Sequence, residues 1–353
     1  MALSRFSILL LIPAIFLSCH KHTPAPARRA YRMGFQSSAP RPDITLYLQS
    51  LSVWTARSDA AIISVQVPWD SLLAGEDPIA YAAYDYQTLV TYCRSKQFAL
   101  WVYIDPENGL DRSVDADDLA AHGLSIAQPP VQQRYQRFVV VMDSILHPDH
   151  LGLALETNLI RFIAPDSIYQ GVKNAAAGAA AAVRVFDPTV ALSVSVQVEV
   201  AWGKLGNTGY TGIAQDLRDF PFMQEVGLSS YPYIVYNTPA DLPDDYYSRL
   251  TTLPLFVSEG GWTSAPVTAN NQTIQGTPAI QAAYITRQGQ LLSSAHGIGW
   301  FQLTFTDLSL GAWPPADQAG LEPFAYLGLV DTTLTPKPAL QAWDTLFAQT
   351  RTD

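Results

Sequence analysis

Cysteine and histidine are scarce in this chain of 353 residues, which has 2 cysteines and 6 histidines. A disulfide-stapled scaffold is therefore excluded, and no H-E-x-x-H motif indicates a zinc site. The segment DPENGLD, residues 105–111, lacks the acidic residue that completes an EF-hand loop, and GNTGYTG, residues 206–212, lacks the spacing of a nucleotide-binding glycine loop. We therefore predict neither a metal nor any other cofactor.

Positive charge is also limited, since Lys plus Arg number 21 against 31 Asp plus Glu, for a net charge of −10. A nucleic-acid partner needs a basic stripe, and the only basic cluster is Arg28 and Arg29 near the N-terminus. Hydrophobic residues make up 48% of the chain and charged residues 15%, which is enough apolar material for a sizeable core. A neutral ligand fits this composition better than a polyanion.

One long apolar run is present, FSILLLIPAIFLS at residues 6–18, and it is too short to span a bilayer comfortably. We predict a signal peptide over residues 1–18. FLSC resembles a bacterial lipobox, which implies lipidation at Cys19. We therefore expect a flexible tether over residues 19–30 and a protein attached to the outer membrane of the cell envelope. Its contact with the membrane would be through that lipid only. The alternative is an ordinary cysteine at the end of the apolar run. Cys93 would then be the one remaining cysteine, so an intrachain disulfide is impossible.

Short apolar runs alternate with helical segments over residues 31–350, and no linker interrupts them. Eight strand–helix repeats predict a single (β/α)₈ TIM barrel of the α/β class, which we expect to be a monomer. We expect the strands at 32–35, 61–67, 99–104, 151–155, 191–201, 226–230, 255–258 and 297–304. We expect the helices at 43–54, 81–97, 129–147, 166–186, 211–224, 243–253, 278–297 and 337–350. In this fold the active site lies at the carboxyl ends of the strands.

Alternation within the strands places several polar residues inside the barrel. In the fifth strand Glu199 would face inward as a third pocket carboxylate, or outward to the surface if the register shifts by one residue. In the eighth strand Trp300 and Gln302 would face inward together. Asn158 would point the same way as Glu156, and Asp105 would reach the pocket from the end of the third strand.

Aromatic residues also gather at strand ends, where rings can stack on the flat faces of sugars. The candidates are Trp69, Tyr231, Trp262 and Trp300. Packing in the core is the alternative for the tryptophans. A carbohydrate is therefore the expected ligand.

Two glutamates stand at strand ends that lie across the barrel mouth from each other, Glu156 after the fourth strand and Glu259 after the seventh. Burying a carboxylate is costly, and two of them facing one cavity is what glycoside cleavage requires. The structural alternatives are an arginine partner for Glu259 and a helix N-cap region for Glu156. A guanidinium locked against either carboxylate would count against a catalytic pair.

The segments LALETNL and FVSEGGW resemble the acid/base and nucleophile strands of the clan A glycoside hydrolases. EVGLSSYPYI is similar to the sixth strand of the family 53 endo-galactanases, and GLVDTTLTPKPALQAW resembles the closing segment of such barrels. The resemblance implies a retaining hydrolase of β-linked poly- or oligosaccharides, with Glu156 as general acid/base and Glu259 as nucleophile. The carboxyl groups would then be about 5–5.5 Å apart.

One position departs from this pattern, because Leu155 occupies the site where the clan has an asparagine that binds the sugar 2-hydroxyl. Asn158 is the candidate substitute. The departure keeps a second function open, a non-catalytic glycan-binding barrel lipoprotein of the same ancestry.

Overall fold

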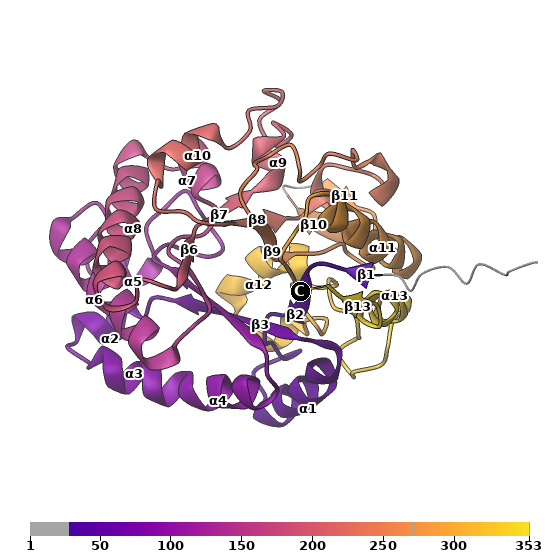
Figure 1. Cartoon of the computed structure of the whole chain (residues 1–353), viewed down its shortest axis with the longest axis horizontal. Helices are drawn as coiled ribbons and strands as arrows, with labels where there is room; N and C mark the ends of the chain where they lie inside the picture. The colour runs from indigo at the N-terminus through magenta and orange to yellow at the C-terminus, as the bar shows by residue number, and fades with distance from the viewer. Residues whose placement is uncertain (1–27, 270–271, 353) are drawn as a thin grey trace, which may run out of the picture.

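The computed structural model describes residues 28–269 and 272–352, and Figure 1 shows helices arranged around a central set of strands. One sheet has the order β2 (Arg32–Phe35), β12 (Gly299–Gln302), β9 (Leu255–Gly260), β8 (Val226–Ser230) and β7 (Ser195–Gln197). The other has the order β3 (Ala60–Gln66), β4 (Ala99–Asp105), β5 (His150–Gly152) and β6 (Ala191–Ser193). Every pairing within these two sheets is parallel, as a (β/α)₈ barrel requires.

The two sheets join into one barrel at two places. A parallel bridge between Gln36 and Ile62 connects β2 to β3. At the other junction β6 and β7 are halves of one expected strand, interrupted at Val194. The predicted (β/α)₈ fold is therefore confirmed.

The expected fifth strand is too long, because its last residues form the helix α9 (Val198–Ala201). The side chain of Gln197 accepts a 2.7 Å hydrogen bond from the backbone N–H of Val200. This N-cap satisfies a free donor of the first helical turn and ends the extended backbone.

The helices follow the expected alternation with some additional short ones. They are α1 (Ile44–Trp54), α2 (Trp69–Leu73), α3 (Pro78–Asp85), α4 (Gln87–Ser95), α5 (Asp117–Ala121), α6 (Pro129–Leu146), α7 (Thr157–Ile163), α8 (Asp166–Phe186), α9, α10 (Ala214–Asp219), α11 (Pro278–Ser294), α12 (Pro315–Leu321) and α13 (Pro338–Phe347). The predicted helix over 243–253 is wrong, since that segment is a series of turns. Its adjacent residues Tyr246 and Tyr247 are both buried and both hydrogen-bonded in the interior, which a surface helix would not permit.

The barrel interior holds an apolar cluster below the strand ends, formed by Ala60, Ile62, Trp101, Tyr103, Leu155, Phe256 and Phe301. Because Phe301 faces inward, its neighbours Trp300 and Gln302 face the helices. Trp300 packs on Trp343 of α13, with ring centroids 4.7 Å apart. The prediction that Trp300 and Gln302 face inward is therefore wrong, and the strand phase is shifted by one residue. The ring that packs into the inner cluster is that of Phe301.

The expected tether extends too far along the chain, because residues 28–30 belong to the fold. Arg28–Arg29 form β1, which pairs in parallel with β13 (Thr350–Arg351). Arg29 is buried and makes a 2.7 Å ion pair with Asp59. The predicted signal peptide, Cys19 and the rest of the tether lie outside the described residues. Within the described part of the chain, no helix has the length and apolar character needed to cross a membrane.

Candidate active site

A cavity of about 680 Å³ opens at the carboxyl ends of the strands. Glu156, Glu259 and Tyr231 all line it. These residues follow or end β5, β9 and β8, so three separate strands contribute to one site. The expected convergence of the two glutamates on a single hollow is present.

A β-bulge aims Glu259 at this cavity. In the pairing of β8 with β9, Leu228 faces Val257 and the next residue, Ser229, faces Glu259, so Ser258 is the extra residue. Strict alternation would have put Glu259 on the outward side with Val257, and the bulge reverses its direction. The next residue, Gly260, has a φ of 154°, and a Cβ there would lie 2.3 Å from a backbone oxygen of β8. Only glycine fits that close approach.

Glu156 is the residue before α7 and has left-handed backbone angles, φ 50° and ψ 43°. Its backbone N–H donates to Ser195 Oγ at 2.9 Å. The side chain makes no capping bond to α7, although the residue occupies the N-cap position. Instead, its two carboxylate oxygens accept hydrogen bonds from Arg112 Nε at 2.9 Å and from Ser229 Oγ at 2.6 Å. Glu156 is 8% exposed.

Arg112 lies in the loop after β4 and stands between two carboxylates. It pairs with Asp105 at 2.6 Å and with Glu156 at 2.9 Å, and it is buried. Burial alone would lower the pKa of the Arg112 guanidinium, but the charges of Asp105 and Glu156 raise it. Asp105, the last residue of β4, therefore contacts the site through Arg112. The sequence analysis did not predict this arginine, which lies seven residues further along the chain.

Glu259 has a different electrostatic setting from Glu156. It is partly buried, and among the described residues Arg112 makes its ion pairs with Asp105 and Glu156, not with Glu259. Burial and then the charge of Glu156 raise the pKa of Glu259 to about 7, while Arg112 and a hydrogen bond from Ser229 oppose the rise. The pKa of Glu259 therefore lies near neutral pH, because the carboxyl group is buried beside the charge of Glu156.

This arrangement is the reverse of the expected roles. The residue that the resemblance makes the acid, Glu156, is paired with a guanidinium, and the raised pKa belongs to the expected nucleophile, Glu259. An arginine partner was predicted as an alternative for Glu259, but the structure gives it to Glu156. The ion pair weighs against Glu156 as a ready proton donor in the free protein.

Asn158 does not reach the cavity. Its side-chain Nδ2 donates to the backbone carbonyl of Gln197 at 2.8 Å, and its Oδ1 accepts from the Gln197 N–H at 2.7 Å. It lies in α7 and ties that helix to β7, so its expected orientation beside Glu156 is wrong. Residue 158 is helical, and the strand alternation used to place it does not apply there.

Glu199 is neither a cavity residue nor a surface residue. It is 0% exposed and accepts hydrogen bonds from Gln197 Nε2, Ser230 Oγ and the Tyr246 hydroxyl at 2.5, 3.0 and 2.7 Å. Burial raises its pKa, and the Tyr246 hydrogen bond opposes the rise. Both alternatives fail because Glu199 lies in the first turn of α9 instead of a strand.

Three further candidates lie in the core, outside the cavity lining. Trp69 is 0% exposed and donates from Nε1 to the carbonyl of Pro106 at 3.0 Å. Trp262 is 0% exposed and packs on Tyr284, with ring centroids 5.6 Å apart. Gln302 Nε2 donates to the backbone carbonyl of Leu327 at 3.0 Å. Like Trp300, Trp69 and Trp262 belong to the large apolar core cluster.

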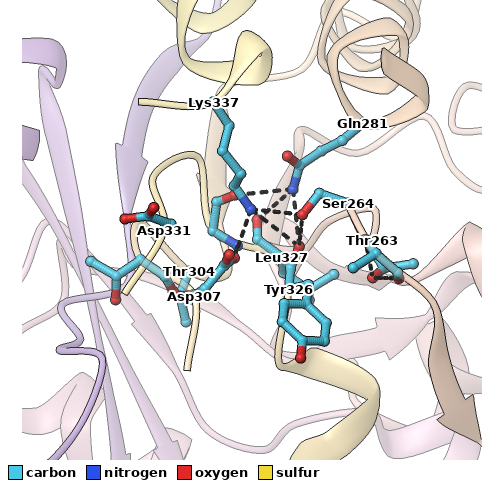
Figure 2. A network of polar contacts seen from close by, with 12 residues as sticks. Thr263, Ser264, Gln281, Thr304, Asp307, Tyr326, Leu327, Asp331 and Lys337 are labelled. Carbon is cyan, nitrogen blue, oxygen red and sulfur yellow. Dashed lines mark hydrogen bonds and ion pairs between the residues drawn. The ribbon is translucent and has the colours of Figure 1, made fainter. Parts of the chain in front are cut away.

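Figure 2 shows a network of polar contacts near the cavity-lining residue Thr304. Lys337 Nζ donates to Asp307 Oδ1 at 2.7 Å and to Ser264 Oγ at 2.8 Å. Gln281 Nε2 donates to several backbone carbonyls, including that of Leu327 at 3.1 Å. The network links the loops after β9 and β12 to the segment before α13, and it therefore holds in place the wall around Thr304.

No protein-family model matches the chain, and no curated protein matches it in sequence. Solved structures share its fold at low identity. An exo-β-1,4-mannosidase from Opitutaceae bacterium strain TAV5 is 14% identical with a TM-score of 0.66, and the match covers 91% of this chain and 59% of that one. The GH53 catalytic domain from Ignisphaera aggregans is 13% identical with a TM-score of 0.58, covering 90% of this chain and 91% of that domain.

A β-glucosidase from Exiguobacterium marinum is 11% identical with a TM-score of 0.60, over 90% of this chain and 98% of the glucosidase. The chain therefore has the (β/α)₈ fold of the clan A glycoside hydrolases. At these identities the likeness concerns the fold.

Proposed function

We propose that the protein is a retaining glycoside hydrolase that cleaves a β-linked poly- or oligosaccharide with Glu156 and Glu259. The observation that carries the proposal is the pair itself. Two carboxyl groups from opposite strand ends face one cavity, and their surroundings differ, since Glu156 pairs with Arg112 while the pKa of Glu259 is raised. A pair with one proton is what the reaction needs, since one group donates a proton and the other attacks or stabilises the anomeric carbon.

We assign the roles as the strand positions imply. Glu259 attacks the anomeric carbon while Glu156 protonates the leaving oxygen, and water then attacks the glycosyl-enzyme with Glu156 as base. In the free protein Glu259 has the raised pKa, so its proton must pass to Glu156 before the first step. Ser229 hydrogen bonds to Glu156, and its hydroxyl also lowers the pKa of Glu259. Its hydroxyl can take the Glu259 proton while it gives its own proton to Glu156 Oε1. Arg112 must loosen its ion pair with Glu156 for this transfer.

The activity is tested by incubating the purified protein and its Glu259→Gln variant with a panel of plant and fungal glycans. Wild-type protein should release reducing ends whose anomeric configuration is retained, measured by proton NMR before mutarotation. The variant should be at least about 10³-fold slower. Equal release by both proteins from every glycan would refute the hydrolase.

The roles are tested with azide on an activated substrate. Glu156→Ala should be rescued as the β-glycosyl azide, because azide replaces water on the glycosyl-enzyme. Glu259→Ala should give the α-glycosyl azide, because azide replaces the nucleophile. The opposite pair of products would reverse the two roles and make Glu259, which has the raised pKa, the acid.

A second candidate is a barrel that binds glycan without cutting it. The ion pair between Arg112 and Glu156 favours it, as does Leu155, whose side chain joins the apolar cluster inside the barrel. Tight binding of a glycan from the panel by wild-type protein, with no product after prolonged incubation, would select this function.

We also propose attachment to the outer membrane through a lipid on Cys19, with the barrel as a monomer that needs no cofactor. Mass spectrometry of the mature N-terminus tests the lipid. Cys19→Ser should move the protein from the membrane fraction to the soluble fraction, and unchanged fractionation would exclude the anchor.

A further inference from the structure

The cavity above the two glutamates has an apolar wall. The side chains that form it are Leu110, Leu303, Leu308, Trp313, Leu321 and Phe324. They come from the loops after β4 and β12 and from the segment around α12. Sugar hydroxyls need polar partners, and this wall does not supply them.

Several polar side chains that line the cavity are already hydrogen-bonded to the protein. Asp43 accepts from backbone N–H groups at the start of α1, at 2.9 and 3.1 Å. Ser37 donates to the Tyr47 hydroxyl at 2.7 Å, and Thr304 donates to a backbone carbonyl. Beyond the end that holds the glutamates and Tyr231, the cavity therefore offers mainly apolar contact.

Apolar side chains also stand exposed at the cavity. Ile44 is 70% exposed and Leu110 is 48% exposed, and both line it. Leu110 is held in place by α12, since a Cβ added at Gly320 would lie 3.2 Å from Leu110 Cδ1. Exposed apolar surface that is contiguous with a cavity is typical of a ligand site, because a bound apolar group removes it from water.

We propose that this wall binds the apolar leaving group of a β-glycoside, an alkyl or aryl aglycone, while the sugar ring lies at Glu156 and Glu259. The proposal rests on the proposed hydrolase and extends its substrates from sugar–sugar linkages to β-glycosides whose leaving group is apolar. The volume of about 680 Å³ suits a sugar with such a group, since ligand pockets usually have about 300–1,000 Å³. The apolar group would gain affinity from burial, at about fourfold for each buried methylene, or about 0.8 kcal/mol.

The test compares methyl and octyl β-glycosides of glucose, galactose and mannose, below their micelle concentrations and with the full-length chain. Methanol and octanol are leaving groups of similar acidity, so a difference reports binding of the chain. We expect kcat/KM to be at least about tenfold higher for the octyl member of the cleaved pair. Benzyl glycosides form a second arm, which distinguishes an aromatic group from an alkyl chain.

Two matched variants locate the effect. Leu110→Asn changes the cavity wall, and Leu48→Asn changes a residue of similar exposure, 55% against 48%, that does not line this cavity. Leu110→Asn should remove most of the octyl preference, measured as the ratio of octyl to methyl kcat/KM within the same variant. Leu48→Asn should keep the preference. Equal effects of the two substitutions would overturn the proposal.

Binding of methyl and octyl 1-thio-β-glycosides, measured by calorimetry, separates this inference from the hydrolase. Turnover without any chain-length preference would overturn the inference and leave the hydrolase standing. Octyl-dependent binding that Leu110→Asn weakens, with no turnover of any glycoside, would overturn the hydrolase and support the apolar site. Equal binding of the methyl and octyl compounds together with equal turnover would overturn the inference.

Discussion

Ser229 Oγ donates a 2.6 Å hydrogen bond to Glu156 Oε1, and the same hydroxyl lowers the pKa of Glu259. Ser229 is 0% exposed and lies directly opposite Glu259 across the bulge in β9. One buried hydroxyl therefore connects the two carboxyl groups. This arrangement makes Ser229 the residue whose substitution tests the pair most directly.

Ser229→Ala should lower kcat by about 10–100-fold with little change in KM, because proton transfer loses its intermediate group. In wild-type protein the alkaline limb of the pH–rate profile should lie near pH 7, since the proton of Glu259 is lost as the pH rises through its pKa.

Ser229→Thr keeps the hydroxyl and is the control, with an expected rate within about tenfold of wild type. A Ser229→Ala enzyme with wild-type kcat would show that the hydroxyl takes no part.

Glu259→Gln should raise the free energy of unfolding at pH 8 by on the order of 1–3 kcal/mol. The pKa of Glu259 rises from 4.5 to about 7 on folding, so between these values the folded state binds more protons than the unfolded state. Stability from this group is then present at low pH and is lost as the pH rises through 7. A glutamine does not titrate, so the variant does not lose this stability as the pH rises. The gain in the free energy of unfolding should therefore vanish by about pH 4.

Urea unfolding at both pH values measures this difference. Glu76→Gln, at an exposed carboxylate, should change stability little at either pH. If Glu259→Gln raised the free energy of unfolding equally at pH 4 and pH 8, the result would contradict a raised pKa at Glu259.

Arg112→Met should destabilise the fold by about 3–5 kcal/mol at pH 7, because it leaves two buried carboxylates, Asp105 and Glu156, without their cation. Arg249→Met is the matched control. That arginine lies 3.9 Å from Asp245, and both side chains are about half exposed, so its loss should cost less than about 1 kcal/mol. Similar unfolding midpoints for the two variants would show that the buried ion pairs contribute little.

Lys337→Met should cost about 3–5 kcal/mol at pH 8, since Asp307 then remains buried and ionised without its cation. The loss should be smaller at pH 5. Burial raises the pKa of Asp307 to about 6 and Lys337 opposes this rise, so without the lysine the carboxyl is protonated at pH 5. A Lys337→Met/Asp307→Asn double variant should recover part of the loss at pH 8. An equal loss at both pH values would argue that Lys337 acts by packing alone.

Local patterns in the sequence predicted most of the barrel correctly. Strands such as β2 and β8 begin and end where their apolar runs do, because burial between barrel interior and helices requires such runs. The segment over 81–97 shows the limit, since it forms α3 and α4 with a break at Tyr86. The helical pattern continues through that residue, and only packing decides where the chain turns.

Directions of single side chains were less predictable. The predicted directions of Trp300 and Gln302 were reversed, because an alternation pattern that is shifted by one residue exchanges the two faces of a strand. Glu259 reached the cavity only through the bulge at Ser258, which no alternation rule indicates. The apolar wall around Leu110 and Phe324 comes from loops, whose shapes follow from contacts distant in sequence.

The sequence by itself determined the repeating strands and helices and the placement of Glu156 and Glu259 at strand ends, because these depend on the period and order of neighbouring residues. The tertiary structure alone decided that Arg112 pairs with Glu156, that burial raises the pKa of Glu259 and that the cavity above them has an apolar wall. Ion pairs, burial and cavity walls depend on which loops meet in space, and that meeting is set by the closure of the whole barrel.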